Sequence, residues 1–150
     1  MHQRIPDDEW KSIVRNVPIV SVDLVVRHDG GVVLGKRTNE PAKGEWFVPG
    51  GRLHKNERLE DAVARIAREE LGVEVTIVGR LGAYEHLYDR SEFEGTDGKH
   101  YIPVGFVVET DDDELNPDSQ HAELEVFRPP FDFEGMHEYV ADYLRDAGVE

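Results

Sequence analysis

Apolar residues along the chain are grouped in a way that predicts strands separated by turns. The stretch 19–27 is rich in valine, and the Asp-Gly-Gly at 29–31 is a turn signal that leads into a second apolar stretch. A loop rich in proline and glycine follows at 38–51. The strands expected on this basis cover 19–27, 32–37, 46–48, about 73–89 and 100–109.

Helical spacing of apolar residues occurs in three segments, of which 57–71 is the best defined. Its apolar positions recur at the interval of one helix face: Leu59, Ala62, Val63, Ile66 and Ala67. Gly72 is expected to end this helix, and Pro18 follows a shorter one at 7–16. A terminal helix is expected over 134–147, with inward positions at Met136, Tyr139, Val140, Tyr143 and Leu144. Helices and strands are interleaved, so we expect a fold of mixed α and β elements.

The length of 150 residues suits one domain, 1–150, that buries its own core. The absence of cysteine excludes disulfides, thiolate zinc sites and a cysteine nucleophile. No apolar run is long enough for a membrane span, and the N-terminal residues lack the apolar core of a signal peptide. We therefore expect a cytoplasmic protein without membrane attachment.

The net charge of −15 is the strongest feature of the composition. A field of this sign repels nucleic acid and anionic membrane surfaces, so neither is expected as a partner. Only 5 of the 17 basic residues are lysine and 12 are arginine. Many acids with few lysines would suit a halophilic host with a salty cytoplasm; an ordinary acidic protein is the alternative.

The chemistry that stands out lies between residues 36 and 70. Glu70 falls eleven positions after Leu59, which places its carboxylate on the apolar stripe of the helix unless it escapes to solvent at the helix end. Paired glycines at Gly50 and Gly51 allow a ligand to approach the backbone closely. Residues 36–58 hold six basic and three acidic side chains. A locally positive loop in an acidic protein suits an anionic small molecule, although chance clustering is the alternative.

These features combine into a pattern that resembles the Nudix box. It runs Gly51, five residues, Glu57, seven residues, then Arg65-Ile66-Ala67-Arg68-Glu69-Glu70-Leu71-Gly72-Val73. The resemblance implies an α+β fold, an α/β/α sandwich with a central mixed β-sheet, the loop-helix-loop of the box and flanking helices. It also implies hydrolysis of a nucleoside diphosphate linked to another group, with Mg²⁺ or Mn²⁺. Ile66 departs from the usual box, which has glutamate there, so we expect one metal ion per subunit.

The same departure is typical of one branch of the family, the GDP-mannose mannosyl hydrolases. Similarity to this branch extends over about residues 4–127, through the stretches 17–57, 85–89, 95–97, 100–101 and 116–121. It implies that water attacks the anomeric carbon of GDP-mannose or a related GDP-hexose and releases GDP and free sugar. The branch also suggests a homodimer.

The resemblance assigns roles to individual residues. Metal ligands would be the Gly50 carbonyl, Glu70 and Gln120, and His121 would be the general base. The remaining assignments are Arg37 and Arg52 against the leaving GDP, Arg65 and Tyr101 in support of them, and Asp23 and His86 on the sugar side. Glu57 and Arg65 would also brace the box by an ion pair.

Two other functions remain open at this point. One is a Nudix pyrophosphatase that attacks phosphorus in ADP-ribose or another nucleotide sugar. The other is a non-catalytic Nudix module that only binds nucleotides, suggested by the missing glutamate at Ile66.

Overall fold

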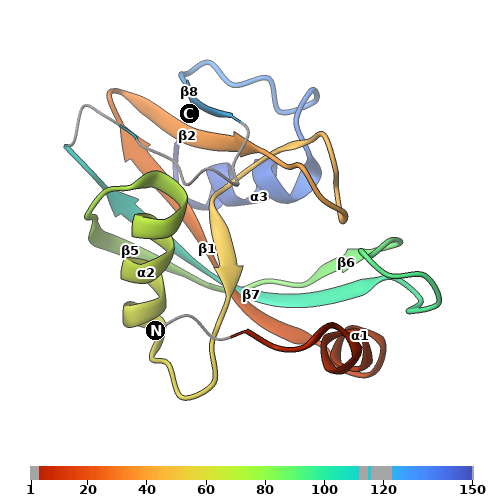
Figure 1. Ribbon diagram of the computed structural model, residues 1–150. Coiled ribbons are helices and arrows are strands. Elements are labelled where there is room, and N and C mark those ends of the chain that lie inside the picture. The colour runs from red at the N-terminus through yellow and green to blue at the C-terminus, as the bar shows by residue number, and fades with distance from the viewer. Residues whose placement is uncertain (1–3, 112–114, 116–122, 150) are drawn as a thin grey trace.

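A mixed β-sheet with a helix against each of its faces forms the core of the protein (Figure 1). The computed structural model describes residues 4–111, 115 and 123–149. The helices are α1 (Asp7–Asn16), α2 (Leu59–Leu71) and α3 (Glu138–Asp146). The strands are β1 (Ile19–His28), β2 (Gly31–Lys36), β3 (Trp46–Phe47), β4 (Gly50–Arg52), β5 (Thr76–Ala83), β6 (His86–Tyr88), β7 (Lys99–Glu109) and β8 (Leu124–Phe127).

Strand β1 lies at the centre of the sheet and has different partners along its two edges. One edge pairs in parallel with β7 over nearly the whole length of β1. The other edge pairs with β2 through residues 26–28 and with β4 through residues 21–23. Strand β2 continues beyond this contact and pairs with β3. The strands β1 and β2 therefore part, and the segment 46–52 fills the space between them.

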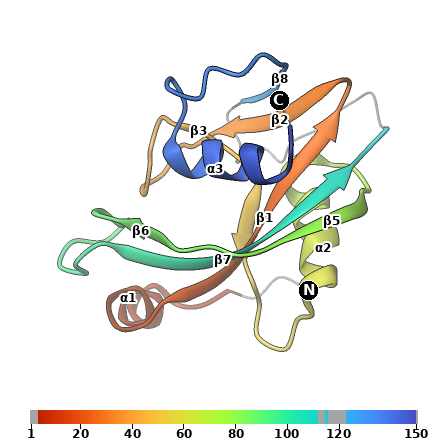
Figure 2. The same ribbon diagram turned by 180° about the vertical axis from the view of Figure 1, so that it is seen from behind.

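The two faces of the sheet carry separate parts of the core. Val22, Leu24 and Val26 of β1 point to one face, where they pack with α2. Val25 points to the opposite face and packs in the cluster that holds α3. Figure 2 shows α3 on the side of the sheet away from α2. This arrangement is the expected α/β/α sandwich, and it follows from the alternation of side chains along a strand.

Helix α2 confirms the helix expected over 57–71, although it begins at Leu59. Its apolar stripe is buried, and Ile66 has no exposed surface. Gly72 ends the helix in a left-handed conformation with a φ of 70°, and its N–H donates to the Arg68 carbonyl. Because a β-carbon is disfavoured in this conformation, the glycine suits the position.

The other helices are also confirmed, with one shift. Helix α1 has the expected bounds. Helix α3 begins at Glu138 rather than at residue 134, because the imidazole of His137 accepts a hydrogen bond from the Tyr139 N–H and caps the helix there.

Three features differ from the expectation. The segment Gly50–Arg52 is strand β4, whereas it was expected to belong to a loop. Strand β8, which pairs with β2, was not expected. The stretch expected as one strand at about 73–89 is divided into β5 and β6. In the described residues no helix has the length and apolarity to span a membrane.

Ile66 offers a direct test of how strongly α2 is held against the sheet. Its side chain packs beneath β4. A β-carbon added to Gly51 of β4 would lie only 3.4 Å from Ile66 Cγ1, which shows how close the two elements are. We expect Ile66→Ala to lower the free energy of unfolding by about 2–5 kcal/mol, through lost apolar burial and the cavity left behind. Urea unfolding measures this value, and a loss below about 1 kcal/mol would contradict the packing described here.

Candidate functional site

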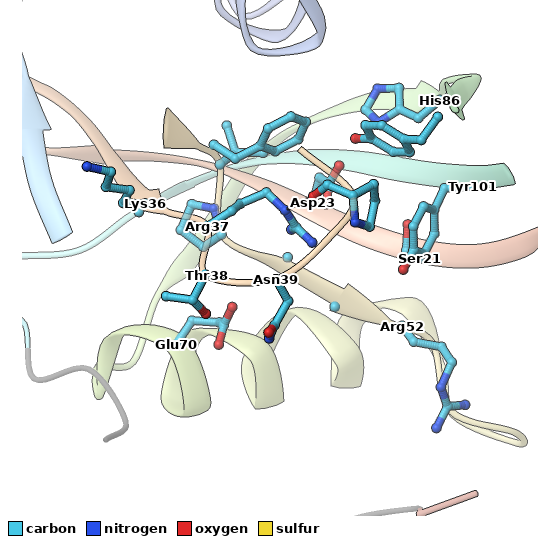
Figure 3. A pocket seen from close by; sticks show the side chains of 18 of the residues that line it. Ser21, Asp23, Lys36, Arg37, Thr38, Asn39, Arg52, Glu70, His86 and Tyr101 are labelled. Atoms are coloured by element: carbon cyan, nitrogen blue, oxygen red, sulfur yellow. Dashed lines mark hydrogen bonds between the residues drawn. The ribbon is translucent and has the colours of Figure 1, made fainter. Parts of the chain in front are cut away.

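A cavity of about 310 Å³ lies at the place where β1 and β2 part. Its walls come from β1, the end of β2 with the loop after it, the segment 47–52, β6 and β7. Glu70 reaches it from α2, and Glu123 and Leu124 line it from the start of β8. Most of the residues predicted for the site therefore meet in one cavity (Figure 3).

The loop before α2 is fixed by Arg65, as the resemblance to the Nudix box implies. Its Nε donates to Glu57 Oε2 at 2.8 Å, and its Nη2 donates to Glu57 Oε1 at 3.0 Å. The same Nη2 donates to the Arg52 carbonyl at 2.9 Å. The hydrogen bond from Arg65 holds the pKa of the Glu57 carboxyl below its usual value. Arg65 is absent from the lining of the cavity. It therefore stabilises the loop through Glu57 and is not placed to contact a substrate, in contrast to the supporting role expected for it.

Gly50 and Glu70 supply the oxygen atoms that suit a divalent metal. Both residues line the cavity, Gly50 from β4 and Glu70 from the last turn of α2. A backbone carbonyl and a carboxylate are hard donors of the kind Mg²⁺ prefers, and Mg²⁺ is commonly held by one or two carboxylates together with substrate phosphates and water. The described residues hold no group of three acidic or histidine side chains arranged for a metal. The donor set therefore fits one ion completed by a substrate.

Asp23 lies within the cavity on the central strand. Its Oδ2 accepts a hydrogen bond from the Tyr143 hydroxyl at 2.7 Å. Burial raises the pKa of the Asp23 carboxyl to about 6, and the Tyr143 hydrogen bond and the charge of Arg37 oppose this rise. Burial and the nearby Asp23 charge also raise the pKa of Tyr143, so its hydroxyl stays protonated and donates.

The two arginines predicted to lie against the leaving GDP are at different parts of the cavity. Arg37 points towards Asp23 in Figure 3, and its Nε donates to the Pro41 carbonyl at 2.6 Å. Arg52 also lines the cavity, but its guanidinium lies 5.4 Å from the centre of the Trp10 ring and is directed away from Asp23. Burial and the charge of Arg65 lower the pKa of Arg52.

His86 forms the centre of an aromatic wall. It is only 3% exposed, and its ring stacks on Tyr139 with the centroids 3.9 Å apart and the planes at 3°. Burial lowers the pKa of His86 to about 4, and the nearby His137 adds to this effect. Its buried Nε2 has no hydrogen-bond partner among the described residues. The ring is therefore neutral at physiological pH and has one nitrogen left for a ligand or water.

Several residues of the cavity were not predicted as site residues. Phe47 and Tyr88 line it beside the predicted Tyr101, and Tyr143 reaches Asp23 from α3. Tyr143 was expected only as an inward residue of the terminal helix. Nothing in the sequence pairs it with Asp23, because 120 positions separate them.

Gln120 and His121, predicted as a metal ligand and the general base, lie outside the described residues. Their assignment stays a prediction.

The sequence of the chain is similar to those of known proteins. The family model of the NUDIX domain matches residues 17–144. The low-salt glycan biosynthesis protein Agl8 of Haloferax volcanii is 63% identical over 141 residues, which are 94% of this chain and 89% of that protein. An ADP-ribose pyrophosphatase of Methanocaldococcus jannaschii is 31% identical over 134 residues, which are 85% of this chain and 74% of that protein.

Solved structures show the same fold. The MutT protein from Methanosarcina mazei superposes with a TM-score of 0.67 at 25% identity, over 87% of this chain and 94% of that one. The NUDIX domain of Shewanella oneidensis NrtR, complexed with ADP ribose, gives a TM-score of 0.68 over 96% of this chain and 97% of that one. At 16% identity the second likeness concerns the fold alone.

The lowered pKa of His86 predicts how stability depends on pH. Above about pH 6.5 the imidazole is neutral in both the folded and the unfolded chain. Between pH 6.5 and about 4 only the unfolded chain gains the proton, so stability is lost as the pH falls. At pH 5 this loss amounts to about 2 kcal/mol.

We expect His86→Phe to keep the stacking and to abolish this contribution. Its free energy of unfolding should fall less than that of the wild type between pH 7 and pH 5, by about 2 kcal/mol. Urea unfolding at both pH values, with a chelator present, measures the difference. Parallel losses in the two proteins would show that His86 has an ordinary pKa.

Proposed function

The chain belongs to the Nudix family, and from this premise we propose that it hydrolyses a nucleotide sugar with the help of Mg²⁺. The proposed substrate is GDP-mannose or a related GDP-hexose, and the products are GDP and free sugar. One observation carries the proposal: a single cavity combines the oxygen donors of Gly50 and Glu70 and the cation of Arg37 with a wall that contains Asp23 and His86. Such a cavity suits a ligand with a charged diphosphate and a polar, uncharged ring.

A relative also supports a substrate that carries sugar. The protein with 63% identity over 94% of the chain is named for low-salt glycan biosynthesis. Glycan synthesis consumes sugars in activated form, and nucleotide sugars are such a form. A role for this chain with a nucleotide sugar is consistent with that name.

The proposed reaction is a displacement at the anomeric carbon. Water forms a new bond to this carbon, and the bond from the carbon to the diphosphate oxygen breaks with its electron pair on the leaving diphosphate. His121 accepts the proton that the attacking water loses. Arg37 stabilises the negative charge that the leaving diphosphate gains. Asp23 and His86 hold the hexose by hydrogen bonds.

Mg²⁺ would be held by Gly50, Glu70 and Gln120, and when bound it would neutralise diphosphate charge. One ion is consistent with the site, because Ile66 is buried in the core beneath β4 and offers no ligand. A diphosphate whose charge is neutralised leaves without protonation, so a single base is sufficient for this route.

A second candidate is attack of water on phosphorus. The M. jannaschii relative, 31% identical to this chain, is named an ADP-ribose pyrophosphatase. Cleavage at phosphorus of ADP-ribose or of a nucleotide sugar would give a nucleoside monophosphate and a sugar phosphate, whereas attack at carbon gives a nucleoside diphosphate and free sugar.

We expect GDP-mannose or a related GDP-hexose to be the best substrate in a panel of nucleotide sugars that also contains ADP-ribose. Hydrolysis in ¹⁸O-labelled water should place the label in the released sugar, as mass spectrometry measures. Label found only in phosphate would favour the second candidate. Absence of metal-dependent turnover across the panel would leave a binding module as the remaining function.

The metal site has its own test in Glu70→Gln. Loss of the carboxylate should lower turnover by at least about 100-fold and raise the Mg²⁺ concentration needed for half-maximal rate. Glu60→Gln is the matched control, because Glu60 lies on the same helix and forms an ion pair with Arg80, with its side chain 66% exposed to solvent. Equal rates for the two variants would remove Glu70 from the metal site.

A further inference from the structure

Glycines flank Asp23 on both neighbouring strands. Its partner on β4 is Gly50, and its partner on β7 is Gly105. Gly105 in turn pairs with Gly82 on β5. Residues that are directly opposite in a sheet share a face, so Asp23 stands in a row where its neighbours have no side chains. Space for a large group from another element is therefore left beside this carboxylate.

Tyr143 of α3 occupies this space. A β-carbon on Gly105 would lie 3.1 Å from Tyr143 Cε1, so the tyrosine ring lies over the glycine. The ring is held by Tyr84, with the centroids 4.5 Å apart, and by His86 at 5.5 Å. Its hydroxyl extends from there to Asp23 Oδ2 on the neighbouring strand, at 2.7 Å.

The second oxygen of Asp23 is constrained from the other side. A β-carbon on Gly50 would collide with Asp23 Oδ1 and would crowd the Val22 carbonyl. The carboxylate is thus confined between the Tyr143 hydroxyl and the backbone of β4. Asp23 and Gly50 both line the cavity. Tyr143 has no exposed surface and is absent from the cavity lining.

We propose that Tyr143 is a positioning residue that fixes the Asp23 carboxylate for hydrogen bonding to the hexose of the substrate. The inference rests on the proposed function. A carboxylate accepts hydrogen bonds from sugar hydroxyls, and their strength depends on its orientation. A buried tyrosine hydroxyl needs a hydrogen-bond partner, and here that partner is a group of the cavity. Helix α3, which contributes no lining residue of its own, acts on the sugar end of the site through this contact.

Tyr143→Phe tests the proposal, because it keeps the ring over Gly105 and removes only the hydroxyl. We expect kcat/KM for the nucleotide sugar to fall about 10- to 100-fold, as for the loss of one hydrogen bond to a charged group. The inhibition constant of the nucleoside diphosphate, which lacks the hexose, should change less than about twofold. In an Asp23→Asn background the same substitution should have almost no further effect, since Tyr143 acts through Asp23.

Tyr84→Phe is the matched control. It removes a hydroxyl from the adjacent ring, and that hydroxyl donates to Asp146 rather than to Asp23. Its kcat/KM should remain within about twofold of the wild type. Gly105→Ala is a second variant that displaces the Tyr143 ring without removing any hydroxyl, and it should reproduce the loss in kcat/KM with the inhibition constant preserved.

The outcomes separate this inference from the proposed function. An active wild type with wild-type kcat/KM in Tyr143→Phe would overturn the inference alone. Equal losses of nucleoside diphosphate and nucleotide sugar affinity, or a full effect of Tyr143→Phe in the Asp23→Asn background, would also overturn it. A wild type that hydrolyses no nucleotide sugar would overturn the proposed function and the inference together.

Discussion

A carboxylate in the middle of the sheet is the constraint on which the rest of the site depends. Most of the central strand β1 is buried, and a charged group within it costs free energy unless other groups satisfy it. A hydroxyl from α3 donates a hydrogen bond to Oδ2, and the glycines opposite Asp23 on both neighbouring strands leave the space for it. The cost remains visible in the pKa of Asp23, which burial raises to about 6.

The parting of β1 and β2 gives this carboxylate access to the cavity. The segment 46–52 fills the gap between the two strands and carries Gly50 to a position against Asp23. Helix α2 supports the segment from below through Ile66 and extends Glu70 to the same cavity. The brace of Arg65 and Glu57 fixes the loop that joins β4 to this helix. The Nudix box thus holds the pocket in shape and also carries the oxygen atoms that we propose as metal ligands.

The parts of the fold that depend on local sequence could be predicted. The stripe of α2, its end at Gly72 and the strand at 19–27 follow from periodicity and backbone preference. The strands β4 and β8 could not be predicted, because Gly50 and Gly51 have low strand preference and both strands are defined by pairing with distant partners. The link from Tyr143 to Asp23 escaped prediction for the same reason.

The proposed function gives the substrate a direction in the cavity: we propose that its hexose end lies against Asp23 and His86 and its diphosphate at Arg37 and Glu70. A crystal structure with Mg²⁺ and a GDP-hexose analogue that resists hydrolysis tests this most directly. We expect a hexose hydroxyl within hydrogen-bond distance of Asp23 and the metal between Glu70 and the diphosphate. A complex with the nucleobase against Asp23, or with the hexose in solvent, would contradict it.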